Sequence, residues 1–158
     1  MDIQIRKAKA EDTHAITEIL RALGWFAHLN SEPLEATQRR VARHLESCHA
    51  DDSHTVYVVE DSAGAVVGYA AVHWLPYMLL AGPEGYVSEL FIQESARGKG
   101  AGTKLLEVIE AEAKGRGCSR LMLLNLRQRE SYQREFYKKH GWEERPGVAN
   151  FVRKLLQF

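Results

Sequence analysis

The amino-acid sequence predicts a mixed α/β domain, and three observations support this class. A hydrophobic strand pattern at residues 55–61 returns across a short turn as a second strand at 66–74, which predicts a β-hairpin. A third strand at 86–92 leads through a glycine-rich turn into a helix and then a strand at 120–126, which predicts a strand–helix–strand crossover. Segments with helical spacing of apolar residues separate these strands.

Length and composition are those of one globular domain. The chain has 158 residues, 45% apolar and 27% charged, so we expect residues 1–158 to form a single domain. This composition excludes a disordered chain, a collagen-like rod and a disulfide scaffold. No apolar run reaches the roughly 18 residues that span a membrane, and the first residues do not resemble a secretion signal. We therefore expect a cytoplasmic protein, with Cys48 and Cys118 as free thiols.

The first half of the chain is expected to supply two helices before the hairpin. Apolar spacing predicts a short strand at 3–6, a helix from Glu11 to Leu23, a connection with large aromatic side chains at 24–34, and a helix from Leu34 to His49. After the hairpin, the pattern predicts a loop at 76–85, the third strand, a glycine-rich turn at 97–102, a helix from Thr103 to Lys114, a buried strand from Arg120 to Leu126, a helix from Ser131 to His140 and a final strand at 151–156.

The zero net charge conceals an asymmetry. Residues 1–80 carry 7 basic and 11 acidic side chains, whereas residues 81–158 carry 14 basic and 10 acidic ones. The overall balance argues against general nucleic-acid binding, which favours a basic protein. An anionic ligand would prefer the second half and a cationic one the first. A chance scatter of solvated charges would give the same split, and both interpretations stay open at this point.

The glycine-rich turn has the chemistry of a phosphate site. Glycines without a Cβ precede a helix whose first backbone amides point outward at the positive end of its dipole. Arg97, Lys99 and Lys104 add positive charge. The P-loop and dinucleotide patterns both fail, because Thr103 stands where each would need a glycine. A turn that only caps a helix is the structural alternative.

Three motifs resemble the GCN5-related N-acetyltransferase (GNAT) family. The first is Arg97-Gly98-Lys99-Gly100-Ala101-Gly102 before a helix, and it resembles that family's acetyl-CoA site. The second is the segment from Phe136 to Trp142, FYKKHGW, similar to the family's Phe-Tyr-x-x-x-Gly-Phe ending. The third is the hairpin VYVVEDSAGAVVGYAAV. The match follows the family's order of elements through essentially the whole chain.

The resemblance implies the fold and the co-substrate. The fold would be a single-domain GNAT-like one, with a mixed, mostly antiparallel sheet, a splayed central strand pair and about four flanking helices. Acetyl-CoA would bind with its acetyl group in the gap between strands 86–92 and 120–126. Its pantetheine arm would pair with the main chain of Leu90, Phe91 and Ile92. Its pyrophosphate would meet the backbone amides of Arg97, Gly98, Lys99, Gly100, Ala101, Gly102 and Thr103.

Two catalytic residues are implied by the same resemblance. Glu89 corresponds to a carboxylate beside the acetyl-accepting amine, where it would act as the base. Tyr137 matches a tyrosine that protonates the leaving thiolate. Strand alternation predicts that Val87, Glu89 and Phe91 share one face. The alternatives are a Glu89 that only binds a substrate cation and a Tyr137 that only packs in the core.

One position departs from the family pattern. The family often has an asparagine seven residues before the tyrosine, where this chain has Glu130, and Asn125 lies earlier and out of register. The contact of that asparagine with the cofactor is therefore in doubt. Glu130 would instead cap the following helix or pair with an arginine.

The resemblance also implies an acceptor site between the 24–34 connection and the 75–85 loop. Candidate lining residues are aromatic or histidine side chains from these segments and the strand between them: Trp25, Phe26, His28, His73, Trp74 and Tyr77. Each could equally serve packing alone. The seven histidines show no metal-ligand spacing, so we expect no metal.

These observations predict an acetyl-CoA-dependent N-acetyltransferase that works by direct attack on a small primary amine. Cys48 and Cys118 have no adjacent base, which disfavours a covalent thiol intermediate. The alternatives are a protein N-terminal or lysine acetyltransferase, a non-catalytic acyl-CoA-binding module, and a structural or interaction domain. We expect no nucleic-acid or membrane partner, and the resemblance is compatible with a homodimer.

Overall fold

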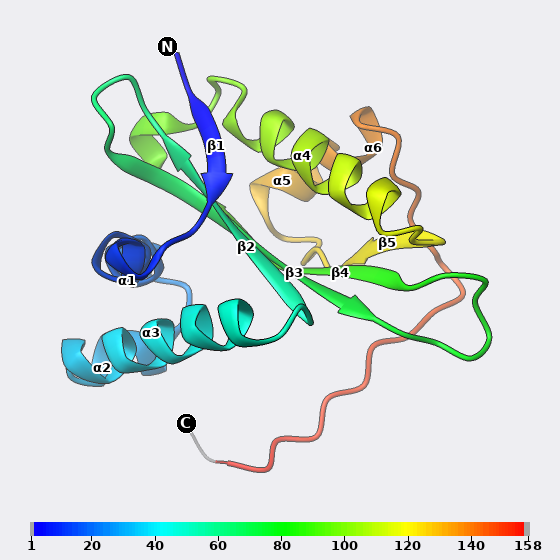
Figure 1. The fold of residues 1–158 in the computed structure, drawn as a ribbon, viewed down its shortest axis with the longest axis horizontal. Helices are drawn as coiled ribbons and strands as arrows, with labels where there is room; N and C mark the ends of the chain where they lie inside the picture. The colour runs from blue at the N-terminus through cyan, green and yellow to red at the C-terminus, as the bar shows by residue number, and fades with distance from the viewer. Residues whose placement is uncertain (1, 157–158) are drawn as a thin grey trace. The chain divides into compact units, whose positions relative to one another are not determined.

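The computed structural model describes residues 2–156 and shows the predicted mixed α/β fold (Figure 1). It divides into two compact units, Met1–Leu123 and Leu124–Phe158, which are described separately below. The assignment of residues 1–158 to one domain stays a prediction. Among the described residues, no helix is both long and apolar enough to cross a membrane.

The first unit is built on a five-stranded sheet in the order β1-β2-β3-β4-β5. The strands are β1 Gln4–Lys7, β2 His54–Glu60, β3 Val66–Leu75, β4 Glu84–Ile92 and β5 Arg120–Leu123. Neighbours from β1 to β4 are antiparallel, and β5 lies parallel to β4. This confirms a mixed, mostly antiparallel sheet. The β4–β5 pair lies at the edge of the described sheet, whereas a central position was expected.

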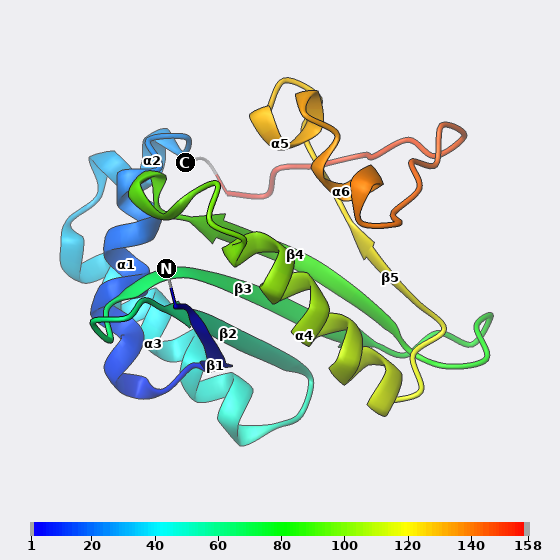
Figure 2. The same ribbon diagram turned by 90° about the horizontal axis from the view of Figure 1, so that it is seen from above.

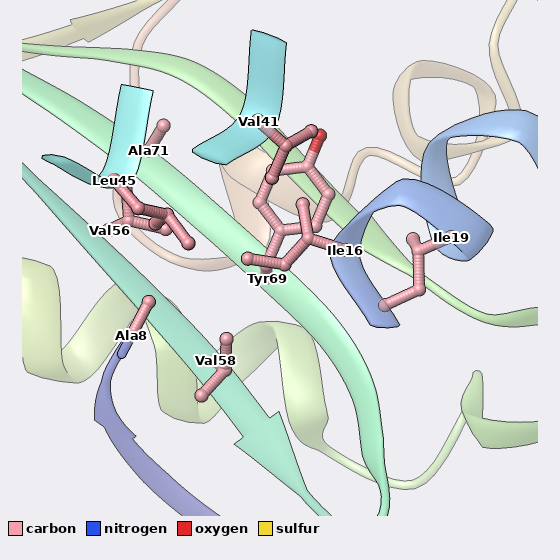
Figure 3. Close-up of a cluster of buried hydrophobic side chains, with 9 residues drawn as sticks. All are labelled: Ala8, Ile16, Ile19, Val41, Leu45, Val56, Val58, Tyr69 and Ala71. Carbon is pink, nitrogen blue, oxygen red and sulfur yellow. The ribbon is translucent and has the colours of Figure 1, made fainter. Parts of the chain in front are cut away.

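Helices cover both faces of this sheet. The helical segments of the first unit are η1 Ala10–Asp12, α1 Thr13–Ala22, α2 Ala27–Ser31, α3 Leu34–Ala50, η2 Glu94–Ala96 and α4 Ala101–Gly115. Helices α1 and α3 pack on one face through a core of buried apolar side chains (Figure 3). That core consists of Ala8, Ile16, Ile19, Val41, Leu45, Val56, Val58, Tyr69 and Ala71. The short helix α2 lies within the 24–34 segment, where a plain connection was predicted.

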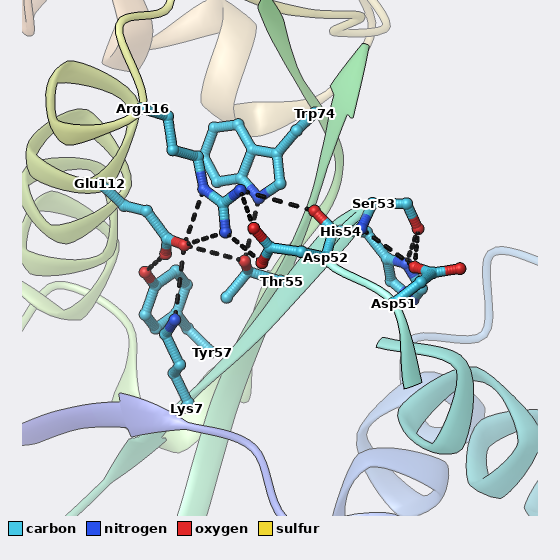
Figure 4. Close-up of polar contacts among 10 residues, drawn as sticks. All are labelled: Lys7, Asp51, Asp52, Ser53, His54, Thr55, Tyr57, Trp74, Glu112 and Arg116. Atoms are coloured by element: carbon cyan, nitrogen blue, oxygen red, sulfur yellow. Dashed lines mark hydrogen bonds and ion pairs between the residues drawn. The ribbon is translucent and has the colours of Figure 1, made fainter. Parts of the chain in front are cut away.

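A polar network fastens α4 to the opposite face (Figure 4). The Glu112 carboxylate on α4 accepts hydrogen bonds from the hydroxyl groups of Thr55 and Tyr57 on β2. Arg116 binds the same carboxylate at 2.7 Å and stacks over the Trp74 ring at 4.6 Å. Odd-numbered residues of β2 therefore face α4, whereas its even-numbered residues face α1 and α3.

The second unit contains two short helices, α5 Glu130–Gln133 and α6 Phe136–Lys139, where one helix from Ser131 to His140 was predicted. The helix is interrupted because Glu135 adopts a left-handed conformation (φ 56°) that a helix cannot contain. The described residues thus form six α-helices, against about four expected.

Two strand predictions were wrong in extent or existence. Residues 151–156 form no strand, and their apolar side chains, those of Phe151, Val152, Leu155 and Leu156, are exposed. A strand needs a hydrogen-bonding partner, and apolar patterning alone does not provide one. The strand predicted from Arg120 to Leu126 ends at Leu123, and Leu124 and Leu126 are more than half exposed, so this stretch is not a buried strand.

Candidate active site

Strand β4 loses its parallel neighbour halfway along its length. Pairing with β5 runs from Glu84 opposite Arg120 to Val87 opposite Leu123 and then ends. Pairing with β3 continues on the other side as far as Ile92 opposite Gly68. Figure 2 shows β5 turning away from β4. The second half of β4 therefore has an edge that β5 does not cover. This is the splay that the family resemblance implied.

A β-bulge marks this point. Ala71 on β3 pairs with Glu89, but its neighbour Val72 pairs with Val87, so Ser88 is one extra residue. The bulge reverses the alternation of faces. Glu89 consequently faces α1 and α3 with Ala71, while Val87 faces α4 with Val72. The prediction that Val87 and Glu89 share a face was wrong, because regular alternation does not allow for an extra residue.

Glu89 is a partly buried carboxyl group in largely apolar surroundings. Burial raises the pKa of Glu89 above its usual value, because a charged carboxylate loses its hydration there. The nearby Tyr69 hydroxyl on β3 opposes this shift. Such a group holds a proton more readily than an exposed glutamate, as a residue that exchanges protons near neutral pH must.

Aromatic rings lie next to Glu89 on the same face. The Phe91 ring meets Trp25 at 5.6 Å and Phe26 at 6.3 Å, both from the segment between α1 and α2. It also meets Tyr69 at 5.7 Å. Trp25 is 40% exposed, so this aromatic cluster extends from the buried face of the sheet to the surface.

The backbone of β4 presents alternate residues to the open edge. The amide of Gln93 bonds Val67 on β3, so in an antiparallel ladder Phe91 also directs its backbone groups toward β3. Leu90 and Ile92 direct theirs the other way. The Ile92 carbonyl accepts a hydrogen bond from Arg97 Nε at 3.1 Å. Leu90 and Ile92 are thus placed to bind an extended ligand, whereas the Phe91 main chain is directed into the sheet.

The predicted phosphate turn lies just beyond this edge. Gly98 (φ 72°) and Gly100 (φ 82°) adopt left-handed conformations that other residues rarely take. Gly100 is the N-cap of α4, which begins at Ala101 rather than at Thr103 as predicted. The first amides of a helix have no acceptor within it, so those of Ala101 and Gly102 are directed at the turn. An added Cβ at either left-handed glycine would meet no atom within 4 Å, so the space above the turn is open.

The basic side chains of the turn differ in their placement. Lys99 is exposed and reaches the Ser95 carbonyl at 2.6 Å, and Arg97 is also exposed. Lys104 instead bonds the Ile3 carbonyl on the way into β1. Arg97 and Lys99 therefore supply the positive charge beside the turn, and Lys104 belongs to the packing of α4.

The expected acceptor-lining residues do not form one group. Trp25 lies at the Phe91 end of β4, with His28 on α2 close to the Phe26 ring (6.3 Å). Tyr77 lies in the loop between β3 and β4, at the other end of the sheet (Figure 1). Trp74 is buried against Arg116 on the α4 face, opposite to that of Glu89. The structure thus brings Trp25 and Phe26 near Glu89 and leaves Trp74 and Tyr77 away from them.

His73 belongs to a cluster of three histidines. Its ring stacks on His54 at 5.3 Å, and His44 on α3 lies 4.4 Å from His54. His73 Nε2 also hydrogen-bonds the hydroxyl of Ser88, the bulge residue, at 3.1 Å. Among the described residues, no group of histidine, cysteine and carboxylate side chains is arranged to hold a metal ion.

Tyr137 lies in the second unit, on α6. Its ring contacts Phe136 at 5.0 Å and Trp142 at 5.9 Å. Burial raises the pKa of Tyr137 to about 12, so its hydroxyl is protonated at neutral pH. Glu130 begins α5, whose first turn has no side-chain cap, and Asn125 accepts a hydrogen bond from Ser131 at 3.0 Å.

Sequence reasoning missed Tyr69, the bulge at Ser88 and the histidine cluster. Tyr69 was part of the hairpin motif but received no role, because its position beside Glu89 depends on the register between β3 and β4. His44, His54 and His73 come together only when α3 packs on the sheet. A hairpin model with a bulge would have placed Tyr69, but no pattern within β4 marks the extra residue.

Comparisons with known proteins agree on one family. Residues 19–142 match the acetyltransferase (GNAT) family. The chain is 38% identical over 79 residues to acetyltransferase Atu2258 of Agrobacterium fabrum, covering 49% of this chain and half the length of that relative. It is 26% identical over 124 residues to thialysine N-epsilon-acetyltransferase of Mus musculus, covering 76% and 72% of the two chains.

The solved structures agree on the fold. A transcriptional regulator from Bacillus halodurans C-125 superimposes with a TM-score of 0.83 at 20% identity, over 98% of this chain and all of that one. The family match extends from α1 through β4, the glycine turn and α4 to Trp142, and so contains every predicted catalytic and cofactor residue. The chain is therefore a member of the acetyltransferase (GNAT) family.

Proposed function

We propose that the protein transfers the acetyl group of acetyl-CoA to the primary amine of a small molecule. The observation that carries this proposal is the position of Glu89. It is a partly buried carboxyl group on the half of β4 that β5 leaves open, a few residues before a glycine turn at a helix N-terminus.

The reaction needs a group that takes a proton from the acceptor. A primary amine has a pKa of ~10 and is mostly protonated at neutral pH, so it must lose a proton before it attacks. Its nitrogen then bonds to the thioester carbon, the carbon–sulfur bond breaks, and the sulfur leaves as a thiolate that takes up a proton. The nitrogen gives up a second proton as the amide forms, and this proton replaces the one that the thiolate takes up. Glu89 receives the proton of the amine, directly or through a water, and its raised pKa suits it to this exchange.

The residues around the turn fit acetyl-CoA. Phosphate oxygens suit the outward amides of a helix N-terminus, and glycines allow close approach of the backbone. Arg97 and Lys99 add charge at the surface. The open edge at Leu90 and Ile92 suits the amide groups of a pantetheine arm, which would extend the sheet by one strand. Tyr137, protonated at neutral pH, would supply the proton to the thiolate.

The surroundings of Glu89 favour a cationic amine. Trp25 and Phe26 offer aromatic faces, which attract ammonium groups, and Glu89 offers a negative charge when ionised. The murine relative is named for an acetyl transfer to the ε-amine of thialysine, which is a small amine of this kind. Protein N-termini and lysine side chains are the acceptors that a substrate panel must also include.

Substitution of Glu89 by glutamine tests the proposal. The variant keeps the shape of the side chain and cannot accept the proton, so we expect kcat/KM at pH 7 to fall about 100-fold or more. The acidic limb of the pH–rate profile should disappear. The assay follows the free thiol of CoA with a panel of small amines, amino acids and peptides. Glu60→Gln on β2, which breaks an ion pair with Arg6 away from the site, is the matched control.

Two results would contradict the proposal. If Glu89→Gln keeps the rate and pH profile of the parent protein with a good substrate, Glu89 is not the base. If the protein binds acetyl-CoA and acetylates no amine in the panel, it is an acyl-CoA-binding module and not an enzyme.

A further inference from the structure

Tyr69 carries a buried hydroxyl group whose hydrogen-bonding capacity is not met. The residue is 2% exposed and lies in the middle of the core (Figure 3). Its hydroxyl makes no hydrogen bond of acceptable geometry to any residue between 2 and 156. A buried hydroxyl without a partner costs free energy, and a phenylalanine would fill the same space without this cost. The hydroxyl therefore calls for an explanation beyond packing.

The register of the sheet places Tyr69 beside Glu89. Tyr69 pairs with Phe91 and Ala71 pairs with Glu89, so Tyr69 and Glu89 are diagonal neighbours on one face. The Cα atoms of diagonal neighbours on adjacent strands lie about 7–8 Å apart, so the side chains of a tyrosine and a glutamate can reach one another. The two groups interact electrostatically. Burial raises the pKa of Tyr69, and the negative charge of Glu89 raises it further.

The elements packed on this face contribute mostly apolar and aromatic side chains. Helix α1 contributes Ile16 and Ile19, and α3 contributes Val41. The segment between α1 and α2 contributes the rings that meet Phe91. The titratable side chains on this face include the three clustered histidines, beside Ser88, and His28 on α2, whose ring lies close to that of Phe26. Among the described residues, Tyr69 is the titratable group that influences the pKa of Glu89.

We propose that Tyr69 is the positioning residue of Glu89, donating its hydroxyl hydrogen to the carboxylate when that carboxylate is ionised. This inference rests on the proposed function, in which Glu89 accepts the proton of the amine. Tyr69 would act through Glu89 without touching the substrate. Its hydroxyl would direct one carboxylate oxygen toward β3 and leave the other for the proton of the acceptor.

The Tyr69→Phe variant tests this role through the pH profile. The lost donor no longer favours the ionised carboxylate, so the pKa of Glu89 rises and the acidic limb of kcat/KM moves to higher pH. We expect a shift of about one pH unit, equivalent to about 1.4 kcal/mol. Tyr57→Phe is the matched control, since it removes a buried tyrosine hydroxyl from the opposite face, where the acceptor is Glu112. The control should lower stability and leave the profile in place.

A double-mutant cycle separates positioning from a structural role. If Tyr69 acts through Glu89, Tyr69→Phe should change the rate about tenfold in the parent protein and hardly at all in the Glu89→Gln background. A structural role would give the same effect in both. A readout that does not depend on catalysis is the unfolding free energy measured against pH. It is measured for the parent protein and Tyr69→Phe, and for each of these with Glu89→Gln added. The difference within each pair reports the pKa of Glu89 with and without the Tyr69 hydroxyl.

The outcomes distinguish the two proposals. If Glu89→Gln removes the acidic limb while Tyr69→Phe leaves it in place, Glu89 is the base and Tyr69 is not its positioning residue. If Glu89→Gln changes neither rate nor profile, the proposed role of Glu89 fails, whatever Tyr69 does. If the stability measurement gives the same pKa of Glu89 with and without the Tyr69 hydroxyl, the positioning role is overturned independently of the reaction.

Discussion

Among single residues, the proposed reaction places opposite requirements on Glu89 and Tyr137, and the effect of burial suits both. A carboxyl group needs a raised pKa to exchange protons near neutral pH, and burial raises that of Glu89. A phenol that donates a proton must remain protonated, and burial raises the pKa of Tyr137 to about 12. The same desolvation thus prepares one group to accept a proton and the other to keep its own.

The Tyr137→Phe variant should lower kcat while acetyl-CoA still binds. The phenylalanine keeps the ring that packs on Phe136 and Trp142 but has no proton for the leaving thiolate. We expect kcat to fall by a factor of about 100 at neutral pH, with the Kd for acetyl-CoA within twofold of the parent value. Steady-state rates and calorimetric titration measure the two quantities. An unchanged kcat would show that the thiolate takes its proton from another group or from water.

The histidine cluster should make the protein less stable in mild acid. Burial lowers the pKa of His44 and His73 below the ordinary value of about 6.5, and their charges disfavour one another. The unfolded chain therefore binds protons more readily, so the unfolding free energy falls as pH drops below about 6.5. Asp12, whose pKa is lowered in the folded protein, affects the unfolding free energy only below its ordinary pKa of 3.8, which is a separate pH range.

Urea unfolding between pH 7.5 and 5 measures this effect. His44→Leu should reduce the dependence on pH, because leucine cannot bind a proton in either state. Glu89 changes stability in the opposite direction, since its raised pKa favours proton uptake by the folded protein. The comparison with the parent protein cancels that contribution. Equal slopes in the two proteins would show that the cluster does not control acid stability.

The glycine turn before α4 could be predicted from the sequence because its signal is local. Residues 97–102 carry their conformational requirement in their own composition, and Gly98 and Gly100 are indeed left-handed. The face of Val87 and the neighbour of Glu89 could not be predicted in this way. Both depend on which residue of β3 lies opposite, and the extra residue at Ser88 changes that register without any mark in the pattern.

Among the elements, α4 is attached to the sheet by polar contacts as well as apolar ones. Glu112 forms an ion pair with Arg116 and accepts hydrogen bonds from the hydroxyl groups of Thr55 and Tyr57. One carboxylate thus joins the helix to β2. Glu112→Ala should lower the unfolding free energy by about 3 kcal/mol, because it leaves partly buried donors without an acceptor. Glu107→Ala, at an exposed position of α4, should change it by less than about 0.5 kcal/mol.

Chemical denaturation of the two variants checks this prediction. The pH–rate profile should keep its shape in both, since the network lies on the face opposite to Glu89. Equal losses of stability in Glu112→Ala and Glu107→Ala would show that the network does not hold α4 to the sheet.

Apart from the short helices η1, α2 and η2, the order and type of elements up to α4 could be predicted because strand and helix periods differ along the sequence. The C-terminal part could not. Glu135 breaks the expected helix through a backbone conformation that composition does not signal. Residues 151–156 have a strand composition, with Phe151, Val152, Leu155 and Leu156 exposed, but form no ladder. Apolar periodicity reports which side chains avoid water and does not report whether a partner strand is available.

At the scale of the whole molecule, the acidic and basic halves of the sequence can be related to parts of the structure. The basic half contains the turn with Arg97 and Lys99, and the acidic half contains the segment with Trp25 and Phe26. This distribution suits an anionic co-substrate on one side of β4 and a cationic acceptor on the other. A homodimer and a cytoplasmic location stay predictions. Sedimentation velocity of the purified protein would test the first.

Acetyl-CoA should stabilise the folded protein if the turn binds it. At 100 times its Kd, a ligand that binds only the folded state adds about 2.7 kcal/mol. At 2–4 °C per kcal/mol, Tm should rise by about 5–11 °C. The double variant Arg97→Glu, Lys99→Glu should lose much of this increase, whereas Arg43→Glu on the exposed side of α3 should keep it. Equal increases in Tm in all three proteins would mean that the charge split is only scatter.

The bulge at Ser88 makes β4 one residue longer than its pairing with β3 requires. Deleting this one residue would restore regular alternation along β4 without changing the composition of the site. If the residues on both sides kept their pairing with β3, Glu89 would follow Val87 directly in a regular ladder, and Val87 would still face the opposite side, with Val72. A deletion at this residue would therefore preserve the faces of the strand and remove the local bend and the hydrogen bond between His73 and Ser88. A redesign that changes the length of β4 at any other position would instead turn part of the strand over.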